Sequence, residues 1–327
     1  MRCVFYRDSS SLTIAVPPPG DARWRAVVRV LRSPLDALGC ALVPASCALC
    51  GSYLPRLSRA PICDVCWSEF KASSDTVCER CGDLLDASST SFGSTFCRAC
   101  RTVPPPFVRA VAFGPYRELM RAAIHALKYD GLHPAAHGLG GLLAQAIAQL
   151  ADEAPEEMLV VPVPLHRSKL SARGFNQARA LAAEALKVLH KMHPAWRLKL
   201  ASSTLMRLRA TEAQAGLTTR QRRINVRGAF SVSDATAIVD KHVLLIDDIL
   251  TTGATARAAA QALEAAGAAS VWVATLARAR HINDTAADSS ESQKPRPMHG
   301  PDDFEVHNLS TNTYGVKTNS SQDQRSF

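Results

Sequence analysis

The chain has 327 residues, a formal charge of +9 at pH 7 and 47% hydrophobic residues. This length suits two domains or one large one, and no apolar run is long enough for a transmembrane helix. The basic charge favours an anionic partner such as a phosphorylated substrate, a nucleic acid or lipid headgroups. Arg7 and Asp8 interrupt the N-terminal region before a triple proline, which is not the pattern of a signal peptide, so we expect a cytoplasmic protein.

Two segments precede the first cysteine pair. Residues 1–22 have no clear hydrophobic period and contain the triple proline, so we expect a disordered tail. Residues 23–46 place arginines between apolar positions, which predicts a basic amphipathic lead-in helix, bent at Pro34. Such a face packs on the chain's own next domain or lies on an anionic membrane surface. We favour the first reading over peripheral membrane contact.

Residues 47–103 hold eight of the ten cysteines, arranged as four Cys-x-x-Cys pairs. Each pair can direct two thiolates at one ion, and two pairs complete the tetrahedral four-cysteine site of structural zinc. Disulfides do not suit a reducing compartment, and a redox Cys-x-x-Cys motif is expected singly. We therefore predict a double zinc ribbon with two Zn²⁺ ions, whose ligands are Cys47, Cys50, Cys63, Cys66, Cys78, Cys81, Cys97 and Cys100.

The spacing leaves two zinc pairings open. The pairs join either in sequence or in a cross-braced order, first with third and second with fourth, and an iron–sulfur cluster is a minor alternative. About fifty residues with few large apolar side chains cannot bury enough surface to fold unaided, so metal binding supplies the folding free energy. No ligand position is left open, so we expect structural rather than catalytic metal.

Residues 107–280 follow a stiff proline boundary and alternate apolar runs with helical patterns. This order predicts an α/β domain with an open, mostly parallel sheet and flanking helices. Pro162 and Pro164 close one strand at its carboxyl end, the usual ligand side of such a sheet. Residues 281–327 are polar and predict a second disordered tail. We expect strands at 108–113, 158–163, 243–246 and 270–276, and helices at 118–127, 135–150, 177–189 and 256–266.

The most informative stretch is Val243–Thr255. Four apolar residues are followed by the adjacent acids Asp247 and Asp248, and then by a small, hydroxyl-rich turn into an alanine-rich helix. Loop amides and the positive end of a helix dipole form a phosphate cradle, and Gly253 lets the backbone approach closely. The cradle residues are Thr251, Thr252, Gly253, Ala254 and Thr255.

The acids suit hydrogen-bond donors or a Mg²⁺ ion rather than the phosphate itself. A ribose 5-phosphate therefore matches both halves of the stretch. It resembles the phosphoribosyl-pyrophosphate (PRPP) motif of the type I phosphoribosyltransferases. The resemblance implies that Asp247 and Asp248 bind the ribose hydroxyls and that residues 251–255 bind the 5-phosphate. The plain alternative is a buried strand before a turn capped by Thr255, but such a strand needs no paired acids.

Two basic segments lie between the predicted strands. Arg167, Lys169 and Arg173 have no neighbouring acid and suit a pyrophosphate, and Asn176 caps the helix that follows. Residues 207–227 hold six arginines against one acid, Glu212, with a short helix expected at 219–226. A solvated basic surface is the alternative. Two basic clusters beside a phosphate cradle favour a functional rim.

These motifs together resemble the ComF family of competence-associated proteins. The resemblance rests on the cysteine array, Ala126–Tyr129, Val161–Pro164, Arg173–Gln177, Ala229-Phe230 and Val243–Thr255. It implies a double zinc ribbon fused to a type I phosphoribosyltransferase-like domain. It also implies a role in natural transformation and in handling incoming single-stranded DNA, with DNA-uptake proteins as partners.

Three functions remain open at this point. As a phosphoribosyltransferase, the chain would use Asp247, Asp248 and Arg173 as catalytic residues, with Arg167, Lys169 and the cradle binding PRPP and Mg²⁺. As a non-catalytic module, it would bind a nucleotide or single-stranded DNA while the zinc ribbons dock partners. As a scaffold, the sheet domain would be a relic, which the intact acids and cradle oppose.

Overall fold

A computed structural model describes residues 46–54, 60–85, 95–209, 226 and 228–279. The tails expected at 1–22 and 281–327 lie outside the described residues, as does all of the lead-in segment 23–46 except its last residue. The helix expected at 219–226 also lies outside them, apart from Val226. Within the described part of the chain, no helix is both long and apolar enough to cross a membrane.

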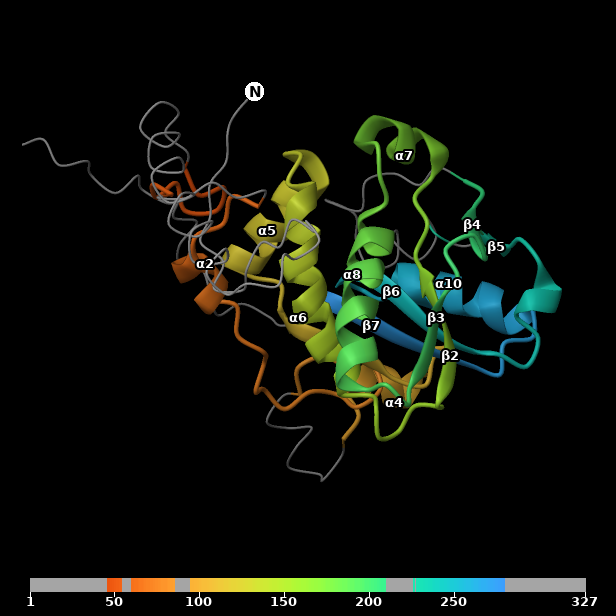
Figure 1. Cartoon of the computed structure of the whole chain (residues 1–327). Helices are drawn as coiled ribbons and strands as arrows, with labels where there is room; N and C mark the ends of the chain where they lie inside the picture. The colour runs from red at the N-terminus through yellow and green to blue at the C-terminus, as the bar shows by residue number, and fades with distance from the viewer. Residues whose placement is uncertain (1–45, 55–59, 86–94, 210–225, 227, 280–327) are drawn as a thin grey trace, which may run out of the picture. The chain divides into compact units, whose positions relative to one another are not determined.

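The main sheet has five parallel strands in the order β1-β7-β6-β2-β3 (Figure 1). The open parallel sheet predicted from the sequence is therefore confirmed. Strand β6 is paired on both sides, with β2 and β7, which explains its unbroken apolar run. The five strands are β1 (Ala110–Pro115), β2 (Glu157–Pro162), β3 (Arg197–Leu200), β6 (His242–Leu250) and β7 (Ser270–Arg278).

Strand β3 and a small antiparallel pair were not anticipated. The pair joins β4 (Leu205–Arg207) to β5 (Phe230–Val232) and stands apart from the main sheet. These strands have only three or four residues each, too few for a hydrophobic period to develop.

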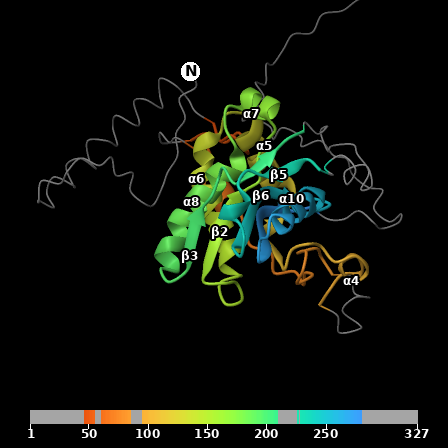
Figure 2. The same ribbon diagram turned by 90° about the vertical axis from the view of Figure 1, so that its right-hand side faces the viewer.

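Helices cover both faces of the sheet. Helices α6 (Ala136–Ala148) and α8 (Gln177–Met192) pack together on one face, and α10 (Ala254–Ala265) packs on the other (Figures 1 and 2). Successive residues of β6 alternate between the two cores: Leu244 and Ile246 join one, and Val243 and Leu245 join the other. The remaining helices are α2 (Asp64–Ser68), α4 (Arg98–Thr102), α5 (Glu118–Tyr129), η1 (His133–Ala135), α7 (Arg167–Arg173) and η2 (Ala235–Ala237).

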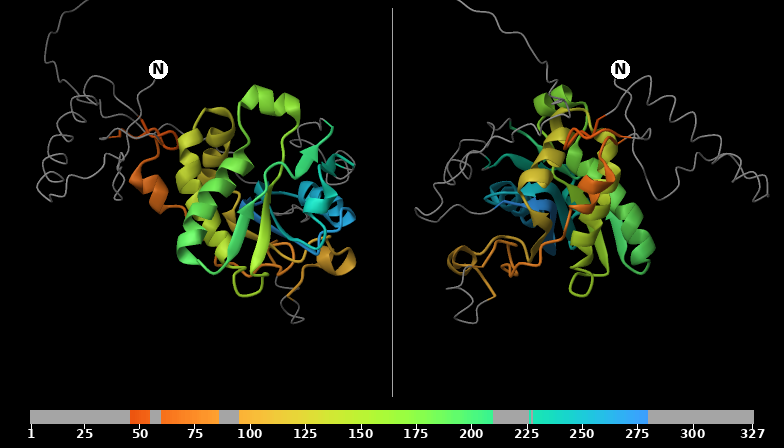
Figure 3. Two further views of the ribbon diagram at one scale, coloured as in Figure 1. Left: turned by 45° about the vertical axis from the view of Figure 1, so that its right-hand side comes forward. Right: turned by 90° about the vertical axis from the view of Figure 1, so that its left-hand side faces the viewer.

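Helix α8 begins where the sequence predicts. The Asn176 side-chain oxygen accepts a hydrogen bond from the Arg179 amide at 3.2 Å, and its amide group donates to the Val163 carbonyl at 3.0 Å. The cap therefore also anchors the helix to the end of β2. The basic segment before it forms the short helix α7, which stands beyond the carboxyl ends of the strands (Figure 3).

The cysteine-rich segments pack on the sheet domain and cover the edge strand β1. The Ser73 amide donates to the Phe113 carbonyl at 3.0 Å, and the Ala110 amide donates to the Arg80 carbonyl at 2.9 Å. Leu54 and Ile62 are buried in the same core as α6. The edge of the sheet at β1 is thus hydrogen-bonded to Ser73, between the second and third cysteine pairs, and to Arg80, inside the third pair.

Candidate functional site

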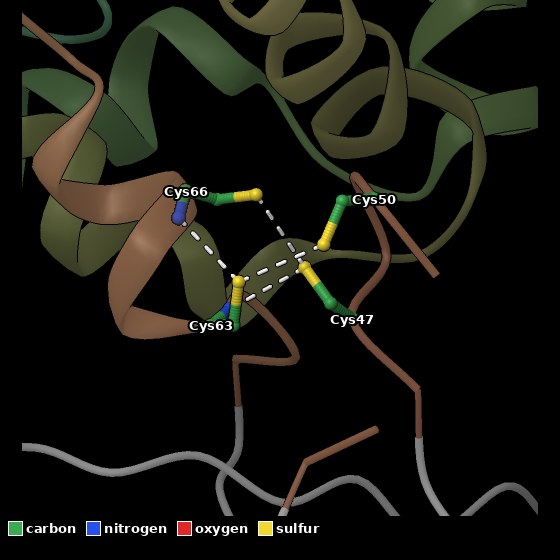
Figure 4. Close-up of side chains that lie close together, drawn as sticks. All are labelled: Cys47, Cys50, Cys63 and Cys66. Atoms are coloured by element: carbon green, nitrogen blue, oxygen red, sulfur yellow. Dashed lines mark hydrogen bonds between the residues drawn. The ribbon is translucent and has the colours of Figure 1, made fainter. Parts of the chain in front are cut away.

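The eight paired cysteines form two four-sulfur clusters. One joins Cys47, Cys50, Cys63 and Cys66, and the other joins Cys78, Cys81, Cys97 and Cys100, with all ligand atoms of a cluster within 4.8 Å of one another. Sulfur–sulfur distances are 3.9 Å for Cys47–Cys66 and 3.7 Å for Cys50–Cys63 (Figure 4). Four sulfurs at a Zn–S distance of about 2.3 Å lie roughly 3.8 Å apart around a tetrahedral ion.

The clusters settle the pairing in favour of sequential neighbours, so the cross-braced alternative is wrong. The spacing suits one small ion in each cluster rather than a larger iron–sulfur core. Both clusters use the same turn: the Gly51 amide donates to the Cys47 carbonyl at 2.9 Å, and the Gly82 amide donates to the Cys78 carbonyl at 2.8 Å. Both glycines have positive φ, which a side chain resists. The donor sets are closed four-thiolate sites that fit structural zinc.

The two neighbouring acids lie on β6 near its carboxyl end but have different surroundings. Asp248 is buried and forms an ion pair with Lys128, from the last turn of α5. Gln177, the first residue of α8, lies 3.4 Å from the other Asp248 oxygen and donates to it. Asp247 is half-buried, and its side chain accepts a hydrogen bond from the Asp248 amide at 2.9 Å.

These surroundings separate the pKa values of the two carboxyl groups. Burial raises the pKa of Asp247 well above its ordinary value, and the neighbouring Asp248 charge raises it further. Burial acts in the same direction on Asp248, but the charge of Lys128 and the hydrogen bonds from Asp247, Lys128 and Gln177 together outweigh it and lower the pKa of that carboxyl. Asp248 is therefore the ionised partner of Lys128, and Asp247 is the acid that holds a proton more readily.

Four cationic side chains from three parts of the chain form a cluster at the acid pair. Burial lowers the pKa of Lys169, and the positive charges of Arg207, Arg173 and Lys128 lower it further. Burial also lowers the pKa of Arg207, although Asp247 opposes that shift. These effects place Arg207, Arg173 and Lys128 within electrostatic range of Lys169, and Lys128 and Arg207 also interact with the acids. This concentration of positive charge suits a polyanion.

Arg173 connects the basic helix to the acid pair. Its guanidinium donates to the Gln177 side-chain oxygen at 2.6 Å and lies 5.0 Å from the centre of the Tyr129 ring. Gln177 in turn donates to Asp248, so Arg173 is held at the end of a short hydrogen-bonded chain. Arg167 is the first residue of α7 and is exposed.

The turn predicted as a phosphate cradle joins β6 directly to α10. Thr251, Thr252 and Gly253 form the bend, and Ala254 and Thr255 open the helix. Gly253 has φ of 72°, in the left-handed region where a side chain is strained. The Thr252 hydroxyl accepts a hydrogen bond from the Ala254 amide at 3.4 Å. The positive end of α10 therefore begins seven residues after Asp247, at Ala254.

Sequence reasoning did not give a role to three residues that complete this cluster. Lys128 and Gln177 were noted only within family motifs, and Arg207 only as part of a basic segment. They lie on three different elements, α5, α8 and β4, so their proximity to the acids depends on the tertiary fold. The available signal was a lysine at the end of an amphipathic helix, which marks a helix end but not what lies beside it.

Two family models match the chain. The "Double zinc ribbon domain" matches residues 39–102, and the "Phosphoribosyl transferase domain" matches residues 177–295. DNA utilization protein YhgH of Salmonella typhi is 33% identical over 238 residues, which cover 72% of this chain and 98% of that protein. The chain belongs to the ComF family.

More distant members of the ComF family include named competence proteins. Competence protein F of Haemophilus influenzae is 26% identical, covering 71% of this chain and 96% of its own length. Competence protein ComFC of Streptococcus pneumoniae is 27% identical, covering 71% of this chain and 99% of its own length. The matched lengths show that this ComF-family chain spans nearly the whole of each relative.

Proposed function

We propose that this ComF-family protein binds PRPP or a related ribose phosphate at the carboxyl edge of β6. The observation that carries the proposal is the cluster in which an acid pair lies among four cations and leads directly into a glycine–threonine turn at a helix N-terminus. One ligand that carries sugar hydroxyls, a 5-phosphate and a diphosphate uses every part of this cluster.

Each part of the cluster has a role in the proposed complex. Residues 251–255 hold the 5-phosphate through backbone amides and threonine hydroxyls. Asp247 accepts hydrogen bonds from the ribose hydroxyls, while Asp248 keeps Lys128 in place beside them. Arg173, Lys169 and Arg167 bind the diphosphate.

The donor set also suits magnesium. Mg²⁺ is bound through one or two carboxylates together with substrate phosphates, and Asp247 is the carboxylate that Lys128 leaves available. When bound, the ion would neutralise charge on the diphosphate. The basic residues named above would supply the remaining positive charge around the diphosphate.

The same arrangement supports phosphoribosyl transfer as the reaction. The bond between ribose C1 and the diphosphate breaks, the electron pair leaves with the diphosphate, and positive charge grows on the sugar until a lone pair of a nucleophilic acceptor bonds to C1. Asp247 and Asp248 oppose that positive charge, and Arg173 stabilises the departing diphosphate.

The experiment is calorimetric titration of PRPP with Mg²⁺ into the wild type and into Asp247→Asn. The control is Glu264→Gln on α10, which also removes one negative charge but lies on the surface. A charge-assisted hydrogen bond contributes about 1.5–3 kcal/mol, so Asp247→Asn should weaken binding roughly tenfold to a hundredfold. Glu264→Gln should bind as the wild type does. A wild type that binds no PRPP would overturn the proposal.

The names of the relatives, a DNA utilization protein and two competence proteins, support a role in DNA use or uptake. A second candidate function, binding of single-stranded DNA without turnover, is favoured by the exposed Tyr129 ring beside Arg173. Titration of an oligonucleotide at two salt concentrations tests it, because phosphate contacts make affinity fall steeply with salt. Tyr129→Ala weakening DNA but not PRPP would assign the two ligands to different surfaces.

A further inference from the structure

A buried arginine joins the second cysteine cluster (Cys78, Cys81, Cys97 and Cys100) to the bend at residues 251–253, which we call the phosphate turn. Arg278 ends β7, and its side chain is only 8% exposed. Its guanidinium donates to the Cys81 carbonyl at 3.2 Å and forms an ion pair with Asp83 at 3.1 Å. The same side chain donates to the carbonyls of Leu250 at 2.9 Å and of Thr251.

This single side chain therefore spans two functional parts of the molecule. Cys81 is a ligand of the second cluster, and Asp83 closes its turn by accepting a hydrogen bond from the Cys78 amide at 2.7 Å. Leu250 and Thr251 are the residues with which β6 ends and the phosphate turn begins. An arginine fork with fixed geometry holds its acceptors at fixed separations.

A second arginine makes a similar connection on the helix side of the turn. Arg257, in the first turn of α10, donates to the carbonyls of Val103 and Pro104, each at 3.3 Å. Those residues directly follow α4, the helix that carries Cys100 of the same cluster. Both ends of the phosphate turn are thus hydrogen-bonded to segments that leave the second cluster.

Among the residues that the structure describes, the first cluster has no comparable connection to the turn. Cys47 and Cys66 are buried in the core that includes α5 and α6, on the face of the sheet opposite α10. Trp67, beside that cluster, packs directly against Gly138 of α6. The two clusters therefore provide an internal comparison, because they have the same chemistry and, within the described ranges, only the second is hydrogen-bonded to the turn through an arginine.

We propose that zinc at Cys78, Cys81, Cys97 and Cys100 positions the phosphate turn, with Arg278 and Arg257 as the positioning residues. Without zinc, the turn that contains Cys81 and Asp83 relaxes, and Arg278 loses both the Cys81 carbonyl as an acceptor and its ion pair with Asp83. The carbonyls of Leu250 and Thr251 are then held less firmly, and the cradle is less well ordered for a phosphate. The proposal rests on the proposed function of the turn and makes its ligand affinity depend on zinc.

The experiment compares the loss of each zinc in the full-length protein. Cys97→Ser removes a ligand of the second site, and Cys63→Ser removes one from the first as the matched control; metal analysis confirms the loss of one zinc from each. Hydrogen exchange of the peptide covering residues 250–258 is measured without ligand, and ribose 5-phosphate is then titrated calorimetrically. We expect Cys97→Ser to speed exchange in this peptide and to weaken binding at least tenfold. Cys63→Ser should leave both unchanged.

A second set of variants leaves both zinc sites intact and therefore tests the coupling even if Cys97→Ser fails to fold. Arg257→Ala removes an exposed connection and should speed exchange in the same peptide and weaken binding severalfold, with partial rescue by Arg257→Lys. Arg109→Ala, which breaks an ion pair with Glu153 elsewhere, is the control and should do neither. Equal effects of Cys97→Ser and Cys63→Ser, or unchanged exchange in Arg257→Ala, would overturn the coupling. Hydrogen exchange is measured without ligand, so it tests the coupling between zinc and the turn independently of binding. A wild type that binds no ribose 5-phosphate would therefore defeat the proposed function, while the exchange rates would still decide the coupling.

Discussion

Replacing Lys128 by methionine tests the ion pair at the centre of the site. The side chains of Lys128 and Asp248 are 17% and 6% exposed, so the variant would leave a buried carboxylate without its partner. Breaking a buried pair in this way costs about 3–5 kcal/mol, and protonation of Asp248 limits the loss. We expect the free energy of unfolding at pH 7.5 to fall by about 3 kcal/mol.

The pH dependence identifies the cause. In the wild type the pKa of Asp248 is lowered, so the pair stabilises the fold above the ordinary pKa of an aspartate and loses its effect as pH falls through the lowered value. In the variant the buried carboxyl takes up a proton, so its deficit should shrink steadily as pH decreases. Urea denaturation at several pH values from about 4.5 to 7.5 measures this trend.

Two further variants make the comparison specific. Lys187→Met removes an exposed pair with Glu184 and should cost less than about 0.5 kcal/mol. Adding Asp248→Asn to Lys128→Met removes the unpaired charge and should recover part of the lost stability. A deficit that does not change with pH, or a double variant no more stable than Lys128→Met, would refute the reasoning.

Three other outcomes are expected. The raised pKa of Asp247 means that the folded protein holds a proton that the unfolded chain releases, so stability should decline as pH rises above about 4, and Asp247→Asn should flatten that decline. Gly141→Ala should stabilise the protein by about 0.5–1 kcal/mol because its new methyl group meets open space, whereas Gly138→Ala should destabilise it by about 1–3 kcal/mol because the methyl group overlaps the Trp67 ring; thermal denaturation of both decides. Metal analysis should find two zinc ions per chain, and a chelator strong enough to remove them should unfold the cysteine-rich segments, as followed by the fluorescence of Trp67.

The parts of the site that are contiguous in sequence were predictable. Asp247 and Asp248, the turn and the helix after it lie on one short stretch whose local chemistry indicates both a strand end and a phosphate site. The start of α8 was predictable for the same reason, because Asn176 caps it with its own side chain.

The residues that complete the site depend on tertiary structure. Lys128 reaches Asp248 across 120 positions in the chain, and Arg278 joins a strand end to a cysteine turn nearly 200 residues before it. No local pattern encodes such contacts. The pairing of the cysteine motifs is a similar case. The four Cys-x-x-Cys motifs are alike in sequence, so the sequence does not indicate which two motifs share a zinc ion.

The cover on β1 has a consequence for the production of the protein. An edge strand with open backbone groups is a template on which other chains assemble, and here the Ser73 amide and the Arg80 carbonyl occupy groups on that edge. Both come from the segment whose folding we attribute to metal. Chains synthesised under zinc starvation should therefore expose the edge and form insoluble aggregates, while supplementing the growth medium with zinc should return them to the supernatant.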